Sequence, residues 1–92
     1  MKATAEIQVI PIGVGSSVRA QVKQAHEILA GSGLTVQLHA WGTNVEGEMH
    51  DIFAAVERIH RVMHESGVVR LATAIKIGTR TDKEPTLAGK MF

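Results

Sequence analysis

Two carboxylates near the middle of the chain, Glu46 and Glu48, have the spacing of a pair that could exchange protons with a substrate. Glu48 stands at the start of a predicted helix, where a negative charge stabilises the helix dipole, and we assign it that role. Glu46 stands between Val45 and Gly47, and a merely solubilising role would give no reason for the glycine. Glu46 is therefore the stronger candidate for contact with a ligand.

A glycine–serine run, Gly13-Val14-Gly15-Ser16-Ser17, opens a predicted helix. Backbone amides at such a position could hold an anion. The run lacks the lysine of a P-loop and the third glycine of a dinucleotide-binding motif. An ordinary turn with Ser16 or Ser17 as the helix cap is favoured.

Histidines supply the remaining reactive groups. His60 and His64 stand four residues apart, as metal-binding pairs do, but no third ligand is evident and His60 lies near the apolar stripe of its helix. We predict packing roles and no metal. His26 or His39 acting with Glu46 is the enzymatic alternative, but no acid–base pair or nucleophile elbow is recognisable by spacing. We therefore predict no catalytic residue and no enzyme.

Trp41 is the only tryptophan, and it lies at the mouth of a predicted hairpin. Two interpretations stay open for it. It could fill the core or an interface, or it could form a stacking wall for a flat heterocycle, because both uses bury an aromatic face.

The composition argues against several classes of protein. The chain has 92 residues, which fit a single domain over 1–92, and a formal charge of +1. Near-neutral charge and 3% aromatic residues argue against nucleic-acid binding, and no apolar run approaches the ~20 residues of a membrane span. The absence of cysteine and of a signal-peptide pattern favours the cytosol. A domain this small is marginally stable alone, so we expect self-association.

Alternation and helical spacing predict the elements that must position these residues. Alternating residues predict strands over 3–12, 34–41 and 68–78, and helical spacing predicts helices over 18–29 and 49–63. The stretch 42–47 has room only for a turn and a short third strand, the hairpin partner of the second. The tail, 79–92, is predicted as a loop with one short helical turn. The order βαββαβ predicts an α+β, ferredoxin-like sandwich, in which two helices cover one face of a four-stranded antiparallel sheet.

Two faces follow from this pattern. The second helix should bury one apolar stripe, formed by Met49, Ile52, Phe53, Val56, Ile59 and Met63. The sheet face turned away from the helices should be mixed polar and small, with Thr4, Glu6, Gln8, Thr35, Gln37, His39, Trp41, Ala72, Ala74 and Lys76. This outer face is either solvated or serves as an oligomer interface or ligand floor.

Several runs resemble one known family over nearly the whole chain. They are 9–13 (VIPIG) leading into 15–18, Ser32-Gly33-Leu34, 42–48 (GTNVEGE), Arg70, 73–80 and Asp82-Lys83. The Gly-Thr-x-x-Glu-Gly element within 42–48 is the most specific. With these runs the chain resembles the thiamine-binding, YkoF-like family of small ferredoxin-fold proteins. Two features depart from the family pattern: Trp41 stands where the family often has a small or flexible apolar residue, and the tail after Lys83 matches loosely.

The resemblance implies a binder of thiamine or its hydroxymethylpyrimidine moiety, without catalysis, cofactor or metal. For such a ligand we expect contacts from Ser17, Trp41, Thr43, Asn44 and Glu46. The resemblance also implies a homo-oligomer, a dimer of dimers. A carboxylate such as Glu46 would accept from the 4-amino group of the pyrimidine or pair with the cation, and Trp41 would stack on either ring. The alternative is a protein-interaction or regulatory module with no small-molecule ligand.

Overall fold

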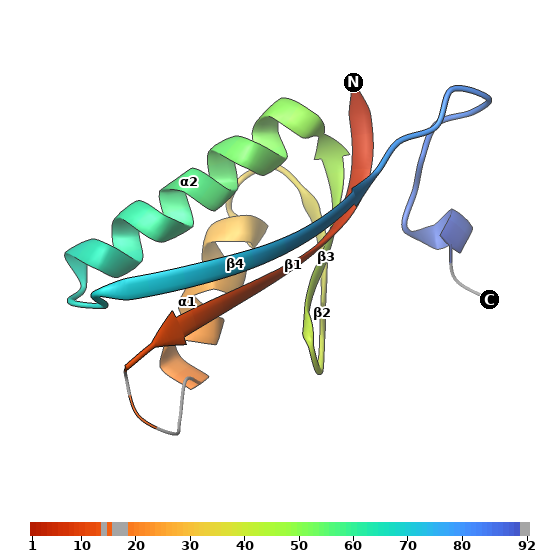
Figure 1. Cartoon of the computed structure of the whole chain (residues 1–92). Coiled ribbons are helices and arrows are strands. Elements are labelled where there is room, and N and C mark those ends of the chain that lie inside the picture. Colours follow the sequence, from red (N-terminus) through yellow and green to blue (C-terminus); the bar gives the residue numbers. More distant parts are fainter. Residues whose placement is uncertain (14, 16–18, 91–92) are drawn as a thin grey trace.

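Four strands and two helices follow one another in the predicted order. The computed structural model describes residues 1–13, 15 and 19–90. The elements are β1 (Lys2–Ile12), α1 (Arg19–Ala30), β2 (Thr35–His39), β3 (Gly42–Glu48), α2 (Met49–Glu65), β4 (Arg70–Gly78) and a short 3₁₀ turn, η1 (Ala88–Lys90) (Figure 1). The predicted helical turn in the tail is thus confirmed.

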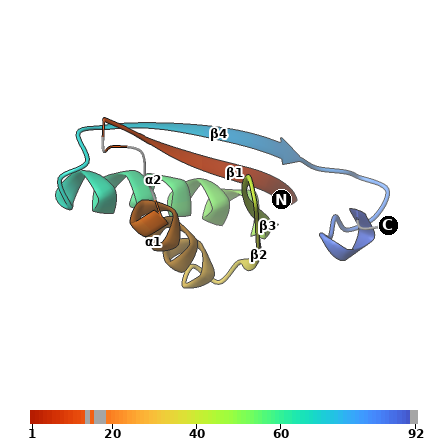
Figure 2. The ribbon, with the colours of Figure 1, turned by 90° about the horizontal axis from the view of Figure 1, so that it is seen from below.

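The strands form one antiparallel sheet in the order β2-β3-β1-β4. Both helices lie on the same side of it, while the C-terminal segment lies on the other side of β2 and β3 (Figure 2). This arrangement is the ferredoxin-like fold, and the predicted fold class is confirmed.

Strand β1 is the centre of the sheet, but its two neighbours cover different parts of it. It pairs with β3 from Lys2 to Ile7, and with β4 from Thr4 to Ile12. Pro11 therefore lies where β1 has a partner on one side only. A proline has no N–H to donate, and this half-paired stretch tolerates it.

The core lies between the helices and the facing side of the sheet. Its side chains come from β1, β3 and both helices, and the largest that are almost wholly buried are Ile7, Leu29, Ile52, Ile59, Met63 and Val45. The prediction for Phe53 was wrong, because its side chain is 47% exposed. At ~100° per residue Phe53 lies a quarter turn from Ile52, beyond the buried stripe, and Ala55 is buried instead.

Two boundaries differ from prediction. Strand β2 ends at His39, so Ala40 and Trp41 form the two-residue turn of a hairpin in which His39 pairs with Gly42. Glu48 is the last residue of β3 and the N-cap of α2, with no side-chain cap hydrogen bond. Its carboxylate accepts from the N-terminal ammonium at 2.9 Å, and this contact lowers the pKa of Glu48.

Neither helix in the described ranges is long and apolar enough to cross a membrane.

Candidate functional site

The sheet face opposite the helices, called here the open face, carries rows of polar residues across neighbouring strands. Glu46 on β3 lies opposite Thr4 on β1, and Asn44 lies opposite Glu6. Glu6 in turn lies opposite Lys76 on β4. Strand pleating puts these alternate residues on one side, so the open face is polar at this end, as predicted.

The C-terminal segment, residues 79–90, covers the same end of the open face. Thr4 was expected on an accessible surface, yet it is only 4% exposed. It lines hollows whose other walls come from this segment, through Leu87 in one and Pro85 in the other. An exposed turn begins the segment, where a hydrogen bond from Arg80 to Asp82 (2.6 Å) lowers the pKa of Asp82 to about 2.

A cavity of about 330 Å³ lies between the segment and the sheet. Its lining mixes hydroxyl, carboxylate, amide and ammonium groups with apolar surface, from Thr4, Ala5, Glu6, Asn44, Lys76, Ile77, Gly78 and Leu87. We call it the open-face cavity. Its size falls at the lower end of the range for small-molecule sites.

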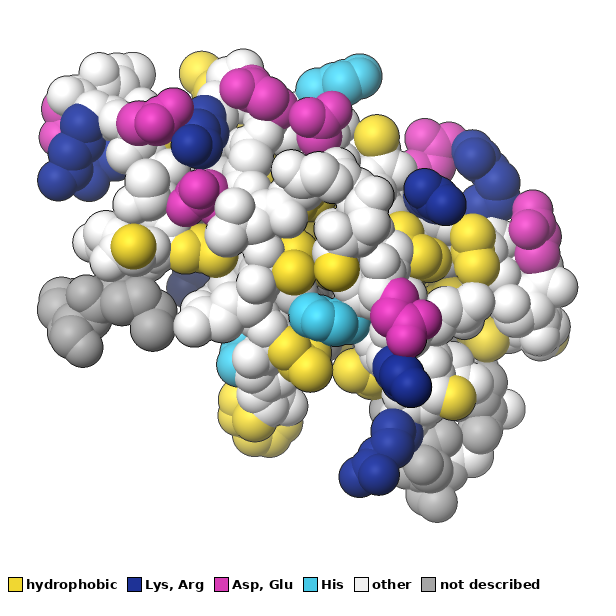
Figure 3. Space-filling view, turned by 180° about the vertical axis from the view of Figure 1, so that it is seen from behind, with side chains coloured by type: hydrophobic (Ala, Val, Ile, Leu, Met, Phe, Trp, Pro, Cys, Tyr) yellow, Lys and Arg dark blue, Asp and Glu magenta, His cyan; other side chains and the backbone are white. Residues whose placement is uncertain are grey.

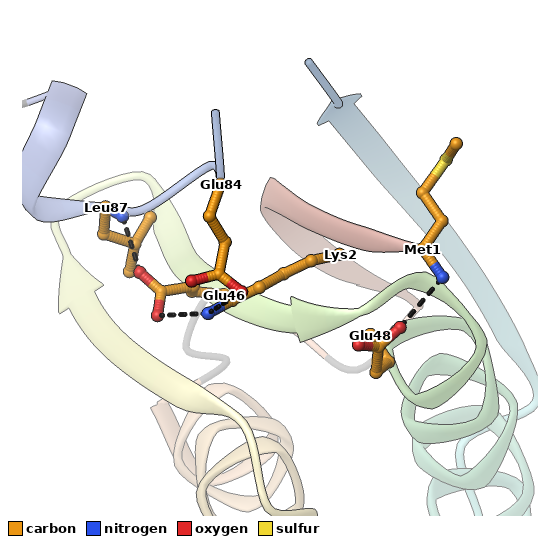
Figure 4. Close-up of polar contacts among 6 residues, drawn as sticks. All are labelled: Met1, Lys2, Glu46, Glu48, Glu84 and Leu87. Atoms are coloured by element: carbon orange, nitrogen blue, oxygen red, sulfur yellow. Dashed lines mark hydrogen bonds and ion pairs between the residues drawn. The ribbon is translucent and has the colours of Figure 1, made fainter. Parts of the chain in front are cut away.

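Glu46 adjoins the open-face cavity and is engaged on both carboxylate oxygens (Figure 4). The backbone N–H of Leu87 donates to its Oε1 at 2.7 Å, and the ammonium of Lys2 lies 3.7 Å from its Oε2. Lys2 also lies 3.5 Å from a carboxylate oxygen of Glu84. With a side chain only 17% exposed, Glu46 is held between the sheet and the C-terminal segment.

A second cavity, of about 260 Å³, lies between α1, β1 and the β2–β3 hairpin. It opens where β1 continues beyond its last pair with β3. Its lining is mostly apolar and includes Pro11, Val22, Leu29, Trp41 and Thr43. We call it the hairpin cavity.

The structure separates the residues that the resemblance brought together. Thr43 and Trp41 line the hairpin cavity, whereas Asn44 lines the open-face cavity and Glu46 adjoins it. Thr43 and Asn44 are neighbours in a strand, so their side chains point to opposite faces of the sheet. Ser17 lies outside the described residues, and so does the predicted serine cap of the first helix.

Trp41 is 77% exposed, so the interpretation as a core residue was wrong. Figure 3 shows a hydrophobic projection at the end of the β2–β3 hairpin. The backbone N–H of Trp41 donates to Nδ1 of His39 at 3.2 Å. Because Nδ1 accepts, neutral His39 carries its proton on Nε2, which lies 3.3 Å from a carboxylate oxygen of Glu6.

The histidines of α2 have structural contacts. His60 Nε2 shares a hydrogen bond with the hydroxyl of Thr73 at 2.6 Å, and His64 Nδ1 donates to the carbonyl of Val68 at 2.7 Å. These contacts join the end of α2 to the loop and strand that follow. No group of three metal-ligating side chains occurs within the part of the chain that the structure describes.

Two contributors to the site were not predicted. Lys2 carried no signal, because its importance depends on Glu46 and Glu84, which lie far away in sequence. Leu87 contributes its backbone N–H, a group that every residue except proline carries, so the residue type gives no signal of this role. Glu6 and Lys76 had been placed on the outer face by alternation alone, and the structure puts both at the cavity.

Comparison with known proteins now assigns the family. Residues 5–92 match the family model described as thiamine-binding protein, so the chain belongs to the thiamine-binding protein family. It is 38% identical to a UPF0045 protein of Synechocystis, over 99% of this chain and 75% of that protein.

Two solved structures share the fold. A hypothetical protein of Methanocaldococcus jannaschii superposes with a TM-score of 0.90 at 37% identity, over 97% of this chain and 91% of the other. A Thermotoga maritima protein, described as a candidate for thiamine biosynthesis or salvage, gives a TM-score of 0.86 at 22% identity, over 98% and 95%. The second likeness is one of fold alone.

Proposed function

We propose that the protein binds thiamine or a related hydroxymethylpyrimidine compound without transforming it, as a homo-oligomer in the cytosol. We place the ligand in the open-face cavity. The observation that supports this choice is that Asn44, Glu6 and Leu87 all line it. Asn44 belongs to the run that carries the family resemblance, and it brings an amide into this cavity.

The lining suits a flat aminopyrimidine. Its ring nitrogens accept hydrogen bonds and its amino group donates them, and the amide of Asn44 can do both. Glu6 offers a carboxylate to the amino group or to the thiazolium cation of thiamine. Leu87 supplies apolar surface for the ring. Such a site needs shape and hydrogen bonds, and no nucleophile.

Calorimetric titration with thiamine, and separately with hydroxymethylpyrimidine, tests this proposal. Asn44→Ala should weaken binding about tenfold, because a hydrogen bond in a largely desolvated site is worth ~1 kcal/mol or more. Trp41→Phe, which changes the hairpin cavity, is the matched control and should leave affinity unchanged. Absence of saturable binding of either compound up to millimolar concentration would refute the proposal.

The hairpin cavity is the competing position for the ligand. Thr43 and Trp41 line it, and the face of an indole ring is suited to stacking on a heterocycle. If the ligand binds there, Trp41→Phe loses affinity, Asn44→Ala does not, and Trp41 emission changes on binding. This outcome would keep the function and move the site.

Self-association would use the part of the open face that the C-terminal segment leaves uncovered. Ile10 and Ile12 are exposed there, and Ala72 lies opposite Ile10. Small and apolar residues side by side permit close approach of a second sheet. Native mass spectrometry should show a multimer, and Ile10→Lys should reduce it to smaller species. A monomer in the wild type would contradict this surface.

A protein-interaction module is the second candidate, favoured by the exposed Trp41 and Leu38 at the hairpin. A lone exposed tryptophan at a rigid turn is typical of an anchor residue in an interface. In that case the oligomer mass stays the same with or without vitamin, no heat of binding is measured, and Trp41→Ala abolishes capture of the partner.

A further inference from the structure

We infer that residues 79–90 form a strap over the open-face cavity, and that Glu46 is the catch holding this strap, not the group that contacts the ligand. The part of this inference that concerns ligand affinity rests on the proposed function. The part that concerns the strap does not.

The carboxylate of Glu46 is already occupied. Its Oε1 accepts from the backbone N–H of Leu87 at 2.7 Å, and its Oε2 faces Lys2 at 3.7 Å. A hydrogen bond to an ionised carboxylate is among the stronger kinds. A ligand amino group at the same carboxylate would have to displace Leu87 or share an oxygen with it.

Lys2 ties the strap a second time. Its ammonium lies between Glu46 on the sheet and Glu84 on the strap, 3.5 Å from the latter (Figure 4). Glu84 is 69% exposed, so this ion pair adds little by itself. The hydrogen bond from Leu87 is therefore the main polar attachment, beside the burial of Pro85 against the sheet. Lys2 keeps the Glu46 side chain directed toward Leu87.

The attached strap completes the cavity. Among the residues that the structure describes, Leu87 is the one lining residue that does not belong to the sheet strands. Release of its N–H from Glu46 would move the Leu87 side chain with it and leave the floor of Thr4, Glu6 and Asn44 open to solvent. A strap fixed by one strong hydrogen bond and by the burial of Pro85 has few contacts to break, so it can open and give a ligand a route in and out.

Amide hydrogen exchange at Leu87, measured without ligand, tests the catch. We expect Glu46→Ala to speed exchange of the Leu87 amide about tenfold or more, because its acceptor is gone. Glu46→Gln should retain most of the protection, since an amide oxygen also accepts. Glu48→Ala is the matched control: it removes a carboxylate from the same strand that contacts the N-terminus and not the strap. Unchanged exchange in Glu46→Ala would overturn the inference.

Thiamine titration of the same variants tests the role of Glu46 in binding. If Glu46 acts through the strap, Glu46→Ala lowers affinity several-fold, and Glu46→Gln stays close to wild type. If Glu46 contacts the cation directly, both variants lose affinity equally, which would overturn the assignment. Should the wild type bind no thiamine, the proposed function fails, while the exchange experiment still decides whether the strap exists.

Discussion

The two faces of the sheet are covered by different means. On one face, α1 and α2 bury apolar side chains such as Ile52, Ile59 and Val45 almost completely. On the other, the C-terminal segment is attached through Glu46 and Lys2 and leaves a cavity beneath it. The stabilisation from apolar burial grows with the buried area, so it holds the helices firmly on the sheet. A hydrogen bond within the protein can be replaced by one to water with a small change in free energy, so a few polar contacts hold the segment less firmly. One face thus stabilises the fold, and the other is free to open.

The largest expected effect is on the helix-covered face. Ile59→Ala should lower the free energy of unfolding by about 2–5 kcal/mol, because Ile59 is fully buried and its loss leaves a cavity. Phe53→Ala, on the same helix but half exposed, is the control and should cost clearly less. Urea denaturation measures both. Equal losses would show that a partner covers Phe53.

Glu46→Ala should lower the free energy of unfolding by only about 0.5–1.5 kcal/mol, because the strap and the carboxylate partners can be solvated when it opens. The same urea series gives this value beside that of Ile59→Ala. A loss as large as that of Ile59→Ala would contradict the difference between the two faces. The strap would then unfold together with the rest of the domain.

Trp41→Ala should change the free energy of unfolding by less than about 0.5 kcal/mol, since the side chain is 77% exposed. Thermal unfolding at several protein concentrations checks it. A large, concentration-dependent loss would place Trp41 in an interface between copies.

The smallest effect concerns pH at the start of the strap. Arg80 lowers the pKa of Asp82 from 3.8 to about 2 in the folded chain. The contribution of this pair is therefore present above pH ~4 and is lost as the pH falls toward 2. An NMR titration of the Asp82 carboxyl should give the lowered value, and Arg80→Gln should return it to the ordinary range. An ordinary value in the wild type would refute the contact.

Periodicity predicted the helix-covered face well because apolar burial leaves a repeating trace in the sequence. All four strands and both helices were found, and the errors in them were the side chain of Phe53 at the edge of a stripe and the boundaries of β2 and β3. The strap left no such trace. Its main attachment uses the backbone N–H of Leu87 and joins it to Glu46, 41 residues away in the chain. Glu46 was singled out for its unusual place in the sequence, but its partners could not be predicted.

The strand order also has a consequence for how the chain is made. β1 emerges from the ribosome before the other strands, while β4, which pairs only with β1, emerges after all of them. The β2–β3 hairpin can pair with one edge of β1 much earlier. Until β4 arrives, the other edge exposes unpaired N–H and C=O groups beside Ile10 and Ile12. Nascent chains stalled before β4 should therefore be the species that chaperones hold.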